Sequence, residues 1–437
     1  QTSGFDELQK HLKNYPPELM QDQTGIDADM IREVARLFAQ TNKGIIFWGM
    51  GVSQHVHGTD NARCLISLAL MTGNVGRRGS GLHPLRGQNN VQGASDAGLI
   101  PMMYPDYQLV EKDEKKEFFE NFWNTSLDDK KGLTVVEIMD SIHEKTIKGM
   151  YILGENPAMS DPDLNHAREA LQMLDHLVVQ DIFLTETATY ADVIFPASAW
   201  PEKNGTVTNT NRQVQMGRKA LDAPGNAKED WWITNELGKR LGLNWDYKHP
   251  KEIYDEMCKT MPSLNNISWD RLEDENSVTY PSKSPTTPGD EIVFGDKFPN
   301  ESGRGKFVPA SVTSPNELPD DEFALILTTG RQLEHWHTGA MTRKASNLNA
   351  IEPEATVSLS PNDVLKNQIK PGDIIKVSTR RGNISLPVRE DRAIPDGVIF
   401  IPFCYNEAAA NLLTNPALDP FGKIPEFKYC AAKIEKI

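Results

Sequence analysis

The chain has 437 residues, enough for two or three domains that each bury a core. Its formal net charge of −15 argues against nucleic-acid binding, and any anion site would need locally concentrated positive groups. The longest apolar runs are too short to cross a bilayer. The four cysteines lack Cys-x-x-Cys spacing, which predicts free thiols in a reducing compartment and no metal site built within this chain. Residue 1 is Gln rather than Met, so we expect a cut that leaves any targeting segment out of view.

Helix and strand patterns alternate at the start of the chain. Residues 27–40 place apolar side chains at helical spacing behind an aspartate cap, which predicts a helix. Residues 44–50 (Gly-Ile-Ile-Phe-Trp-Gly-Met) indicate a buried strand, and residues 61–76 indicate a second helix closed by Gly73. Residues 105–150 are predicted to be helical, with a charged, solvated face over one buried stripe.

Three short apolar runs follow, at residues 149–157, 175–183 and 191–198, and each ends in polar or glycine-containing turns. Helical patterns at residues 163–174 and 185–190 separate them. This alternation is typical of a parallel, doubly wound sheet, so an α/β fold is expected here.

The composition changes in the last third of the chain. Residues 266–322 are rich in Pro, Ser and charge, which predicts a long linker. From residue 323 onward strand patterns dominate, separated by turns such as Lys-Pro-Gly-Asp and Ile-Pro-Asp-Gly. This pattern predicts a compact all-β barrel after the α/β region.

The predicted strand ends carry candidate nucleotide contacts, because crevices open beyond the carboxyl ends of parallel strands. Gly49 and Gly51 would let backbone amides approach a phosphate, although a plain tight turn also explains them. Polar and small residues follow the next two strands: Gly154, Glu155, Asn156 and Ser160, then Gln180, Asp181 and Thr185. The Asp181 carboxylate can accept two hydrogen bonds from guanine, at N1–H and N2–H. Capping of the following helix by Asp181 and Thr185 is the alternative.

A polar and cationic segment, residues 328–343, follows the first strand of the predicted barrel. Its threonines, its glycine and Arg331 suit contact with a phosphate or a pterin. His335 and His337 lack a further carboxylate or cysteine partner, so hydrogen bonding is favoured over metal ligation.

Near the end of the chain, Asn411, Asn415 and Lys428 accompany a predicted short helix. Carboxamides of this kind can contact the edges of a heterocycle, since each carries both donors and an acceptor. Loop capping by the two asparagines is the alternative.

The segment His83–Gly93 (His-Pro-Leu-Arg-Gly-Gln-Asn-Asn-Val-Gln-Gly) holds one arginine among carboxamides and no carboxylate. Arg86 therefore has no ion-pair partner among its neighbours in the sequence. Two interpretations stay open at this point: Arg86 donates to carbonyl groups of its own loop, or it binds an external anion.

Taken together, residues 83–98, 151–157, 178–198 and 328–343 resemble the molybdopterin oxidoreductase family. Within that family the chain is similar to the C-terminal two thirds of a formate dehydrogenase catalytic (alpha) subunit. Residues 411–435 look most like the cytoplasmic, NAD-dependent type, so a cytoplasmic location is expected.

The resemblance implies Rossmann-like doubly wound domains followed by a double-psi β-barrel. Residues 1–86 would be the remainder of one Rossmann-like domain, 87–265 a second, dinucleotide-binding one, 266–322 the linker and 323–437 the barrel. It also implies molybdenum or tungsten held by two pyranopterin guanine dinucleotides, that is, bis(molybdopterin guanine dinucleotide). The implied cofactor contacts are Gly49, Gly51, Gly87, Gly154, Glu155, Asn156, Ser160, Gln180, Asp181, Thr185, Asp192, Thr329, Arg331, His335, His337, Thr338, Asn411 and Lys428.

Arg86 and Gln88 match family residues that lie beside the metal and are the expected catalytic residues. A bidentate guanidinium is a natural clamp for formate, and holding the carboxylate would aim its C–H bond at the oxidised centre. The expected reaction is reversible oxidation of formate to CO₂. Gln88 could donate to the substrate or the pterin without adding charge.

Family members also carry cysteines for an iron–sulfur cluster and a Cys or selenocysteine that ligates the metal, and neither is found in this sequence. We therefore expect this chain to be a fragment that is inactive alone. A missing N-terminal segment is its first expected partner. Iron–sulfur and flavin or NAD subunits are the other expected partners. Two alternatives remain: another family member such as an assimilatory nitrate reductase, and a cofactor-free scaffold.

Overall fold

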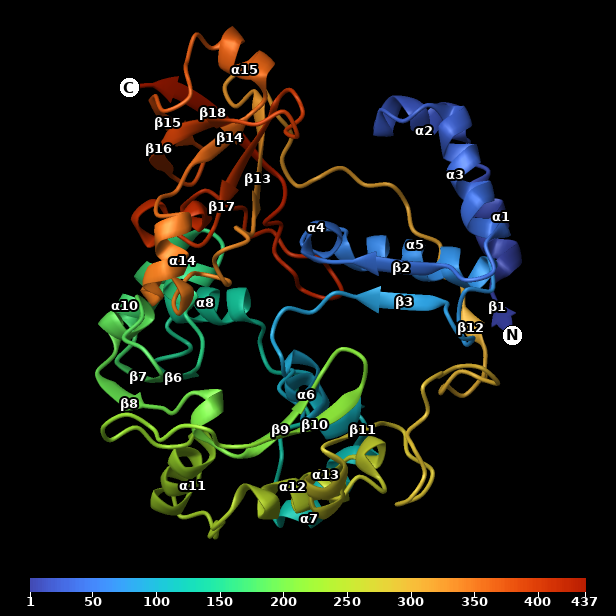
Figure 1. The fold of residues 1–437 in the computed structure, drawn as a ribbon, viewed down its shortest axis with the longest axis vertical. Helices are drawn as coiled ribbons and strands as arrows, with labels where there is room; N and C mark the ends of the chain where they lie inside the picture. The colour runs from blue at the N-terminus through green and yellow to red at the C-terminus, as the bar shows by residue number, and fades with distance from the viewer.

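Two parallel sheets and a closed barrel organise the chain in the computed structural model, which describes residues 1–437 (Figure 1). The first sheet has two strands, β2 (Ile45–Trp48) and β3 (Gly81–Pro84), and the second has three in the order β6-β7-β8. The expected α/β fold with a C-terminal β-barrel is confirmed. The barrel and the arm formed by the first three helices lie on opposite sides of the β2–β3 sheet (Figure 1).

Helices near the start of the chain form where their caps and periodicity predict them. Helix α3 (Ala28–Gln40) begins after Asp27, whose carboxylate accepts hydrogen bonds from the backbone N–H of Asp29 and Met30. Helix α5 (Gly58–Met71) is followed by Gly73, which has a φ of 66° and so takes the left-handed conformation that ends helices.

The remaining elements complete the α/β part of the chain. The other helices are α1 (Phe5–Leu12), α2 (Pro17–Thr24), α4 (Met50–Ser53), α6 (Val91–Asp96), α7 (Asp113–Trp123), α8 (Val135–His143), α9 (Pro157–Ser160), α10 (Leu164–Met173), α11 (Asp230–Arg240) and α12 (Pro250–Thr260). Two short strands, β4 (Met103–Tyr104) and β5 (Gln108–Leu109), precede α7. Of the predicted helical stretch 105–150, only α7 and α8 are regular helix. No helix is both long enough and apolar enough to cross a membrane.

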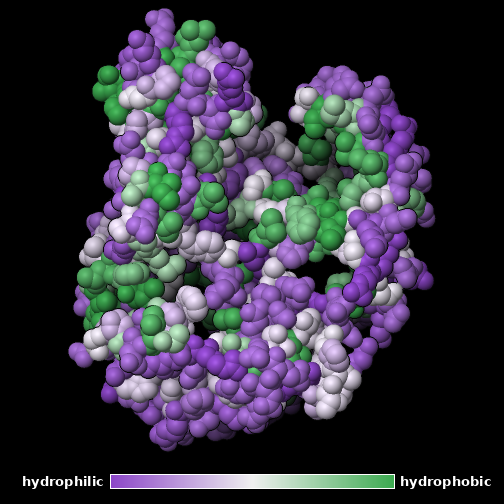
Figure 2. Space-filling view, in the orientation of Figure 1, coloured by the Kyte–Doolittle hydropathy of each residue, from purple (hydrophilic) through white to green (hydrophobic).

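The strand predicted in residues 44–50 is confirmed by β2, but its predicted burial is wrong. Ile45 and Phe47 of β2 are 45% and 58% exposed. A run of apolar residues is buried in a parallel sheet only when helices cover both faces, and β2 has a single neighbour, β3. Figure 2 shows the resulting apolar surface over the β2–β3 region.

The three-stranded sheet has its own hydrophobic core. It joins β6 (Gly149–Leu153), β7 (His176–Asp181) and β8 (Val193–Pro196) in parallel register. Helices α8 and α10 pack on it, and their apolar residues share one buried cluster with the strands. Because both crossovers leave the three carboxyl ends at one edge, the loops that follow them meet there.

Regular structure extends into the predicted linker 266–322. Helix α13 (Trp269–Glu275) and strand β11 (Ser277–Thr279) pack against β10 (Gln213–Gly217) in one buried cluster, with β9 (Gly205–Thr208) completing an antiparallel sheet. Beyond Thr279 the segment holds only β12 (Gly305–Lys306), which pairs with β1 (Thr2–Ser3).

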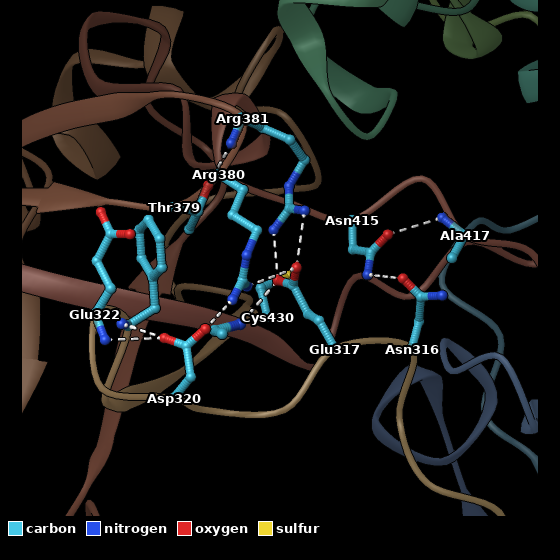
Figure 3. Close-up of polar contacts among 12 residues, drawn as sticks. Asn316, Glu317, Asp320, Glu322, Thr379, Arg380, Arg381, Asn415, Ala417 and Cys430 are labelled. Carbon is cyan, nitrogen blue, oxygen red and sulfur yellow. Dashed lines mark hydrogen bonds and ion pairs between the residues drawn. The ribbon is translucent and has the colours of Figure 1, made fainter.

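Ion pairs fasten the end of the linker to the barrel (Figure 3). Glu317 accepts hydrogen bonds from Arg381 Nη2 at 2.6 Å and from the backbone N–H of Ala431 at 2.8 Å. Asp320 accepts from Arg380 Nη2 at 2.6 Å. Burial opposes ionisation of Glu317, but the hydrogen bond and charge of Arg381 still hold its pKa below the usual value. The last residues of the linker are therefore fixed on the barrel surface.

Six strands close the barrel in the order β13-β17-β14-β16-β15-β18. Their bounds are β13 (Leu325–Gly330), β14 (Val357–Leu359), β15 (Ile374–Ser378), β16 (Asn383–Glu390), β17 (Val398–Pro402) and β18 (Cys430–Lys436), with α14 (Ser346–Ile351) and α15 (Pro361–Lys366) between strands. Two pairs, β13–β17 and β14–β16, are parallel and the others are antiparallel. The inward alternate positions supply most of a core of 20 buried residues.

Replacing Leu327 with Ala should destabilise the barrel. Leu327 is fully buried in the barrel core, so truncation removes contacts and leaves a cavity, at a cost of about 2–5 kcal/mol in unfolding free energy. Chemical denaturation of the purified chain measures this loss. Leu365→Ala on α15 is the matched control, because Leu365 is 78% exposed, and a shift as large as that of Leu327→Ala would contradict the prediction.

Candidate functional site

The loops at the carboxyl edge of the three-stranded sheet line a cavity of about 280 Å³. The barrel closes its other side with residues 336–341, and Gln88 reaches it from the loop after β3. Of the predicted contacts, the cavity brings together Gln88, Gly154, Glu155, Asn156, Gln180, Asp181, Thr185, His337 and Thr338. The expectation that ligands bind beyond the carboxyl ends of parallel strands therefore located one wall of the cavity, and the barrel supplies the other wall.

Protein contacts use most of the polar capacity of Asn156. Its Nδ2 donates to Glu186 at 2.8 Å, and its Oδ1 accepts from the Thr187 hydroxyl at 2.8 Å and the Thr187 backbone N–H at 3.1 Å. This buried network joins the loop after β6 to the loop after β7. Asn156 thus shapes the cavity wall and has little capacity left for a ligand.

Asp181 both lines the cavity and caps its own turn. Its Oδ1 accepts from the backbone N–H of Ile182 at 2.7 Å and, more weakly, from that of Phe183 at 3.4 Å. Burial raises the pKa of the Asp181 carboxyl, and these two hydrogen bonds oppose the shift. Thr185 Oγ1 likewise accepts from the Ala188 N–H at 3.4 Å. Thr185 therefore accepts from the first turn of the following 3₁₀ helix η2 (Thr187–Tyr190), whereas Asp181 bonds two residues that precede this helix, so helix capping is not confirmed for Asp181. Guanine recognition stays a prediction.

The loop after β8 also lines the cavity, although none of its residues was among the predicted contacts. Ser198 is 1% exposed, and its Oγ is buried without any hydrogen-bond partner. Lys203 is paired with Asp230, which also accepts from Gln180 Nε2 at 2.7 Å. The signal was present, because residues 191–198 were predicted as the third parallel strand and its end must lie at the same edge.

A smaller cavity of about 70 Å³ lies between the barrel and two distant segments. Its lining brings together the predicted contacts Ser160, Thr329, His337, Asn411 and Lys428 with Met50, Gln54, Phe403 and Phe427. His337 and its neighbourhood connect it to the larger cavity, since His337 lines both. Asn411 Nδ2 donates to the backbone carbonyls of Met159 and Ser160, each at 3.0 Å, which fixes the barrel against α9.

Three cations at this junction make no ion pair. Lys428 is 9% exposed and donates to the Thr329 carbonyl at 2.6 Å; burial, with the nearby Arg331 charge, lowers its pKa to about 8. Arg331 lies over the rings of Trp336 and Phe403, and desolvation lowers its pKa. In a chain of net charge −15, cations without carboxylate partners mark a site for an anion.

Arg86 is the third of these cations and is exposed in the loop after β3. Its Nη1 makes one long contact, 3.5 Å, to the carbonyl of Val91. The loop passes close to the barrel, since a Cβ on Gly87 would lie 3.1 Å from the Trp336 ring and 3.5 Å from Arg331 Nη2. Residues 86–88 therefore place the Gln88 carboxamide on the wall of the larger cavity and an exposed guanidinium two residues before it in the same loop.

The two histidines of the segment 328–343 do not form a metal site. His335 is buried, and its Nε2 lies 2.8 Å from the Glu352 carbonyl. Burial lowers the pKa of His337, with Glu155 opposing the shift. No group of three or more His, Cys, Asp or Glu side chains could hold a metal ion. The hydrogen-bonding interpretation is confirmed for His335.

Six of the implied cofactor contacts line neither cavity: Gly49, Gly51, Gly87, Asp192, Arg331 and His335. Gly49 and Gly51 flank the start of α4, and there Met50 and Gln54 face the smaller cavity instead. Asp192 lies just before β8, at the opposite edge of the sheet, where its carboxylate accepts from the backbone N–H of Leu177 at 2.7 Å. A ligand bound at the carboxyl edge of the three-stranded sheet would therefore not contact Asp192.

The four cysteines are free thiols that are spread over the chain, as predicted. Cys64 and Cys258 lie in α5 and α12, and Cys430 begins β18, but Cys404 falls in the loop after β17 rather than on a strand. Burial raises the pKa of Cys258, Cys404 and Cys430, which keeps these thiols protonated.

Comparison with family models matches residues 9–240 to the molybdopterin oxidoreductase model and residues 325–431 to the molydopterin dinucleotide binding domain. The chain is 45% identical over 438 residues to the F420-dependent formate dehydrogenase subunit alpha of Methanocaldococcus jannaschii, covering 100% of this chain and 64% of that protein. It is 33% identical over 440 residues to formate dehydrogenase H of Escherichia coli, covering 62% of it. The chain thus spans a little under two thirds of the length of these relatives.

Among solved structures, acetylene hydratase from Pelobacter acetylenicus matches all of this chain and 67% of its own, with a TM-score of 0.77 and 20% sequence identity. At that identity the match shows a shared fold alone. The full coverage includes both the parallel sheets and the barrel, so the shared fold extends over the whole chain.

Proposed function

We propose, from the premise that the chain belongs to the molybdopterin oxidoreductase family, that it forms part of a formate dehydrogenase catalytic subunit. The reaction is reversible oxidation of formate to CO₂. Relatives at 45% and 33% identity are named formate dehydrogenases, which supports the substrate class. The observation that carries the proposal is Arg86, an exposed guanidinium without a carboxylate partner beside a cavity lined by Gln88.

The residues around the two cavities fit bis(molybdopterin guanine dinucleotide). Its pyrophosphates are anionic, and Arg331 and Lys428 are cations without ion-pair partners. Ser198 Oγ is buried in the cavity wall without a partner, so a ligand that accepts or donates a hydrogen bond there would relieve a cost of about 1–3 kcal/mol.

The two cavities divide the proposed binding roles. Asp181 and Gln180, at the sheet edge, would contact a guanine, because a carboxylate and a carboxamide match its polar edge. Thr329, Asn411 and Lys428 would contact the pterin or pyrophosphate from the barrel side. Residues 1–86 and 87–265 are proposed as Rossmann-like domains and 323–437 as the dinucleotide-binding barrel.

Bound, the cofactor supplies molybdenum or tungsten as a two-electron redox centre. Arg86 binds the formate carboxylate through its forked N–H groups, which fixes the two oxygens and leaves the C–H bond as the end that is free to react. Gln88 adds a neutral donor at the cavity wall and so orients the substrate without competing for the Arg86 charge. Bringing reactants together in this way can contribute several kcal/mol to lowering the barrier.

The chain is proposed to act with other components. None of its cysteines lines either cavity, so the metal ligand and iron–sulfur cysteines would come from a further polypeptide segment. The isolated 437 residues are expected to be inactive. Partner subunits would pass the electrons on; NAD was the expected acceptor, and the name of the M. jannaschii relative adds F420 as a candidate.

Formate-dependent dye reduction by a holoenzyme that contains this chain tests the proposal. Activity with formate, together with guanine dinucleotide found by mass spectrometry, is the expected result. Activity with nitrate and none with formate would contradict formate as the substrate and favour a nitrate reductase. If the chain retains no dinucleotide in the holoenzyme, the result would instead favour the alternative that it is a cofactor-free scaffold.

A further inference from the structure

The carboxylate of Asp96 is buried at the end of α6, the helix that follows the Arg86 loop. Asp96 is 3% exposed. Its Oδ1 accepts a hydrogen bond from Gln92 Nε2 at 2.6 Å, and its Oδ2 accepts from the Tyr280 hydroxyl at 3.0 Å. Gln92 Nε2 also lies 3.2 Å from the hydroxyl of Tyr107. Each oxygen of a buried charge thus has a neutral donor.

The residues of this network come from three parts of the fold, since Gln92 and Asp96 both lie on α6. Tyr107 belongs to the 3₁₀ turn η1 (Pro105–Tyr107), and Tyr280 follows β11. Tyr280 is itself held, because its backbone N–H donates to the Arg212 carbonyl at 3.0 Å and the Arg212 guanidinium returns a hydrogen bond to its carbonyl. Asp96 therefore ties α6 to the β9–β11 sheet.

The opposite end of α6 carries the Arg86 loop. Arg86 Nη1 contacts the carbonyl of Val91, the first residue of α6. Asn90 Oδ1 accepts from the backbone N–H of Thr208 at 2.8 Å. A Cβ on Gly93 would lie 2.2 Å from Asn90 Oδ1, so only glycine permits this close approach. A displacement of α6 is thus transmitted directly to residues 86–91.

Neutral donors hold the Asp96 carboxylate in place. Gln92 and Tyr280 satisfy both of its oxygens, so Asp96 joins α6 to the segment after β11 without an ion pair. Burial raises the pKa of the neighbouring Tyr107 phenol, and the Asp96 charge raises it further.

We propose that Asp96 is a positioning residue whose network with Gln92 and Tyr280 fixes α6 and so holds the Arg86 loop in place for the substrate carboxylate. This inference rests on the proposed function. Asp96 does not touch the substrate in this arrangement. Loss of one neutral donor, as in Tyr280→Phe, breaks the hydrogen bond between Asp96 and the segment after β11, which loosens α6 and the Arg86 loop that it carries.

Amide hydrogen exchange in the 437-residue chain tests the positioning role and does not depend on an activity assay. Asp96→Asn should speed exchange at residues 86–93 by about tenfold or more, because hydrogen bonds to a buried charge are lost. Asp363→Asn is the matched control: Asp363 is a buried aspartate in the first turn of α15 whose carboxylate accepts from the Ser360 hydroxyl and the Gly397 N–H, so its effect should stay in the barrel. Unchanged exchange at residues 86–93 would overturn the positioning role.

Steady-state kinetics of the holoenzyme test the effect on Arg86. Tyr280→Phe removes one hydroxyl and should raise the KM for formate by about tenfold with kcat changed less than about twofold. Tyr104→Phe is the matched control, because Tyr104 is also buried but its hydroxyl has no hydrogen-bond partner. A KM for Tyr280→Phe equal to that of Tyr104→Phe overturns the inference.

The two proposals can fail separately. If Arg86→Ala leaves the KM for formate unchanged, the substrate clamp is wrong, and hydrogen exchange still tests the positioning role. If Arg86→Ala raises the KM while neither Tyr280→Phe nor Asp96→Asn does, the clamp stands and the positioning role is overturned.

Discussion

Arg86→Ala in the holoenzyme should lower kcat/KM for formate by about 100-fold or more. A guanidinium that forms two hydrogen bonds to a carboxylate is worth about 2–5 kcal/mol when it is truncated, and 1.4 kcal/mol is a factor of ten. No neighbouring cation can replace it in the loop, since Arg86 is the only charged residue between His83 and Gly93. The loss should appear mainly as a higher KM if Arg86 binds formate and the transition state equally.

Formate titrations of dye reduction measure this effect. Arg86→Lys keeps the positive charge but loses the forked pair of N–H donors. Its kcat/KM for formate should therefore fall between those of the unsubstituted enzyme and Arg86→Ala. Arg392→Ala, at an exposed arginine in the turn between β16 and β17, is the control for loss of a surface charge and should leave kinetics unchanged. Equal activity of Arg86→Ala and Arg392→Ala would exclude the clamp.

Lys428→Met should sharply reduce the retention of the dinucleotide cofactor. The Lys428 ammonium is buried, has no carboxylate partner and lines the smaller cavity. Removing a buried cation from a hydrogen-bonded charge pair costs about 2–5 kcal/mol, so affinity should fall by roughly 30-fold or more. In the chain without cofactor the same substitution should be neutral or stabilising, because a buried unpaired charge is a burden.

The pH dependence follows from the lowered pKa of Lys428, about 8 against 10.5 for the free side chain. Without cofactor, the folded chain carries the cost of a buried charge below pH 8, and that cost falls as the pH rises from 8 towards 10.5. Cofactor affinity should change in the opposite direction and weaken as the pH rises above about 8, since neutral lysine no longer attracts phosphate.

Cofactor content after dialysis, measured by mass spectrometry between pH 7 and 9.5 (roughly the range around this pKa), checks both statements. Lys433→Met is the control, because Lys433 pairs with Glu322 at the barrel surface. Retention by Lys428→Met equal to that of Lys433→Met, or a pH dependence that survives in Lys428→Met, would exclude a role for this charge.

Local sequence patterns predicted several elements and one wall of the site. Caps and periodicity are local, so α3 and its Asp27 cap were predictable, as were the strands β6, β7 and β8. The rule that loops after parallel strands meet at one edge then placed Glu155 and Asp181 at a common cavity. Local pattern also showed that Arg86 has no acidic neighbour in its loop.

Tertiary contacts decided the rest. The burial of β2 depends on which elements cover it, and a strand with one neighbour leaves Phe47 exposed whatever its composition. Lys428 and Met50 share a cavity although 378 positions separate them (428 − 50), and no local signal predicts such a contact. The hydrogen bond from Tyr280 to Asp96, across 184 positions, is of the same kind. Sequence patterns record the periodicity of single elements, whereas the partner of each charge is chosen only when distant elements pack.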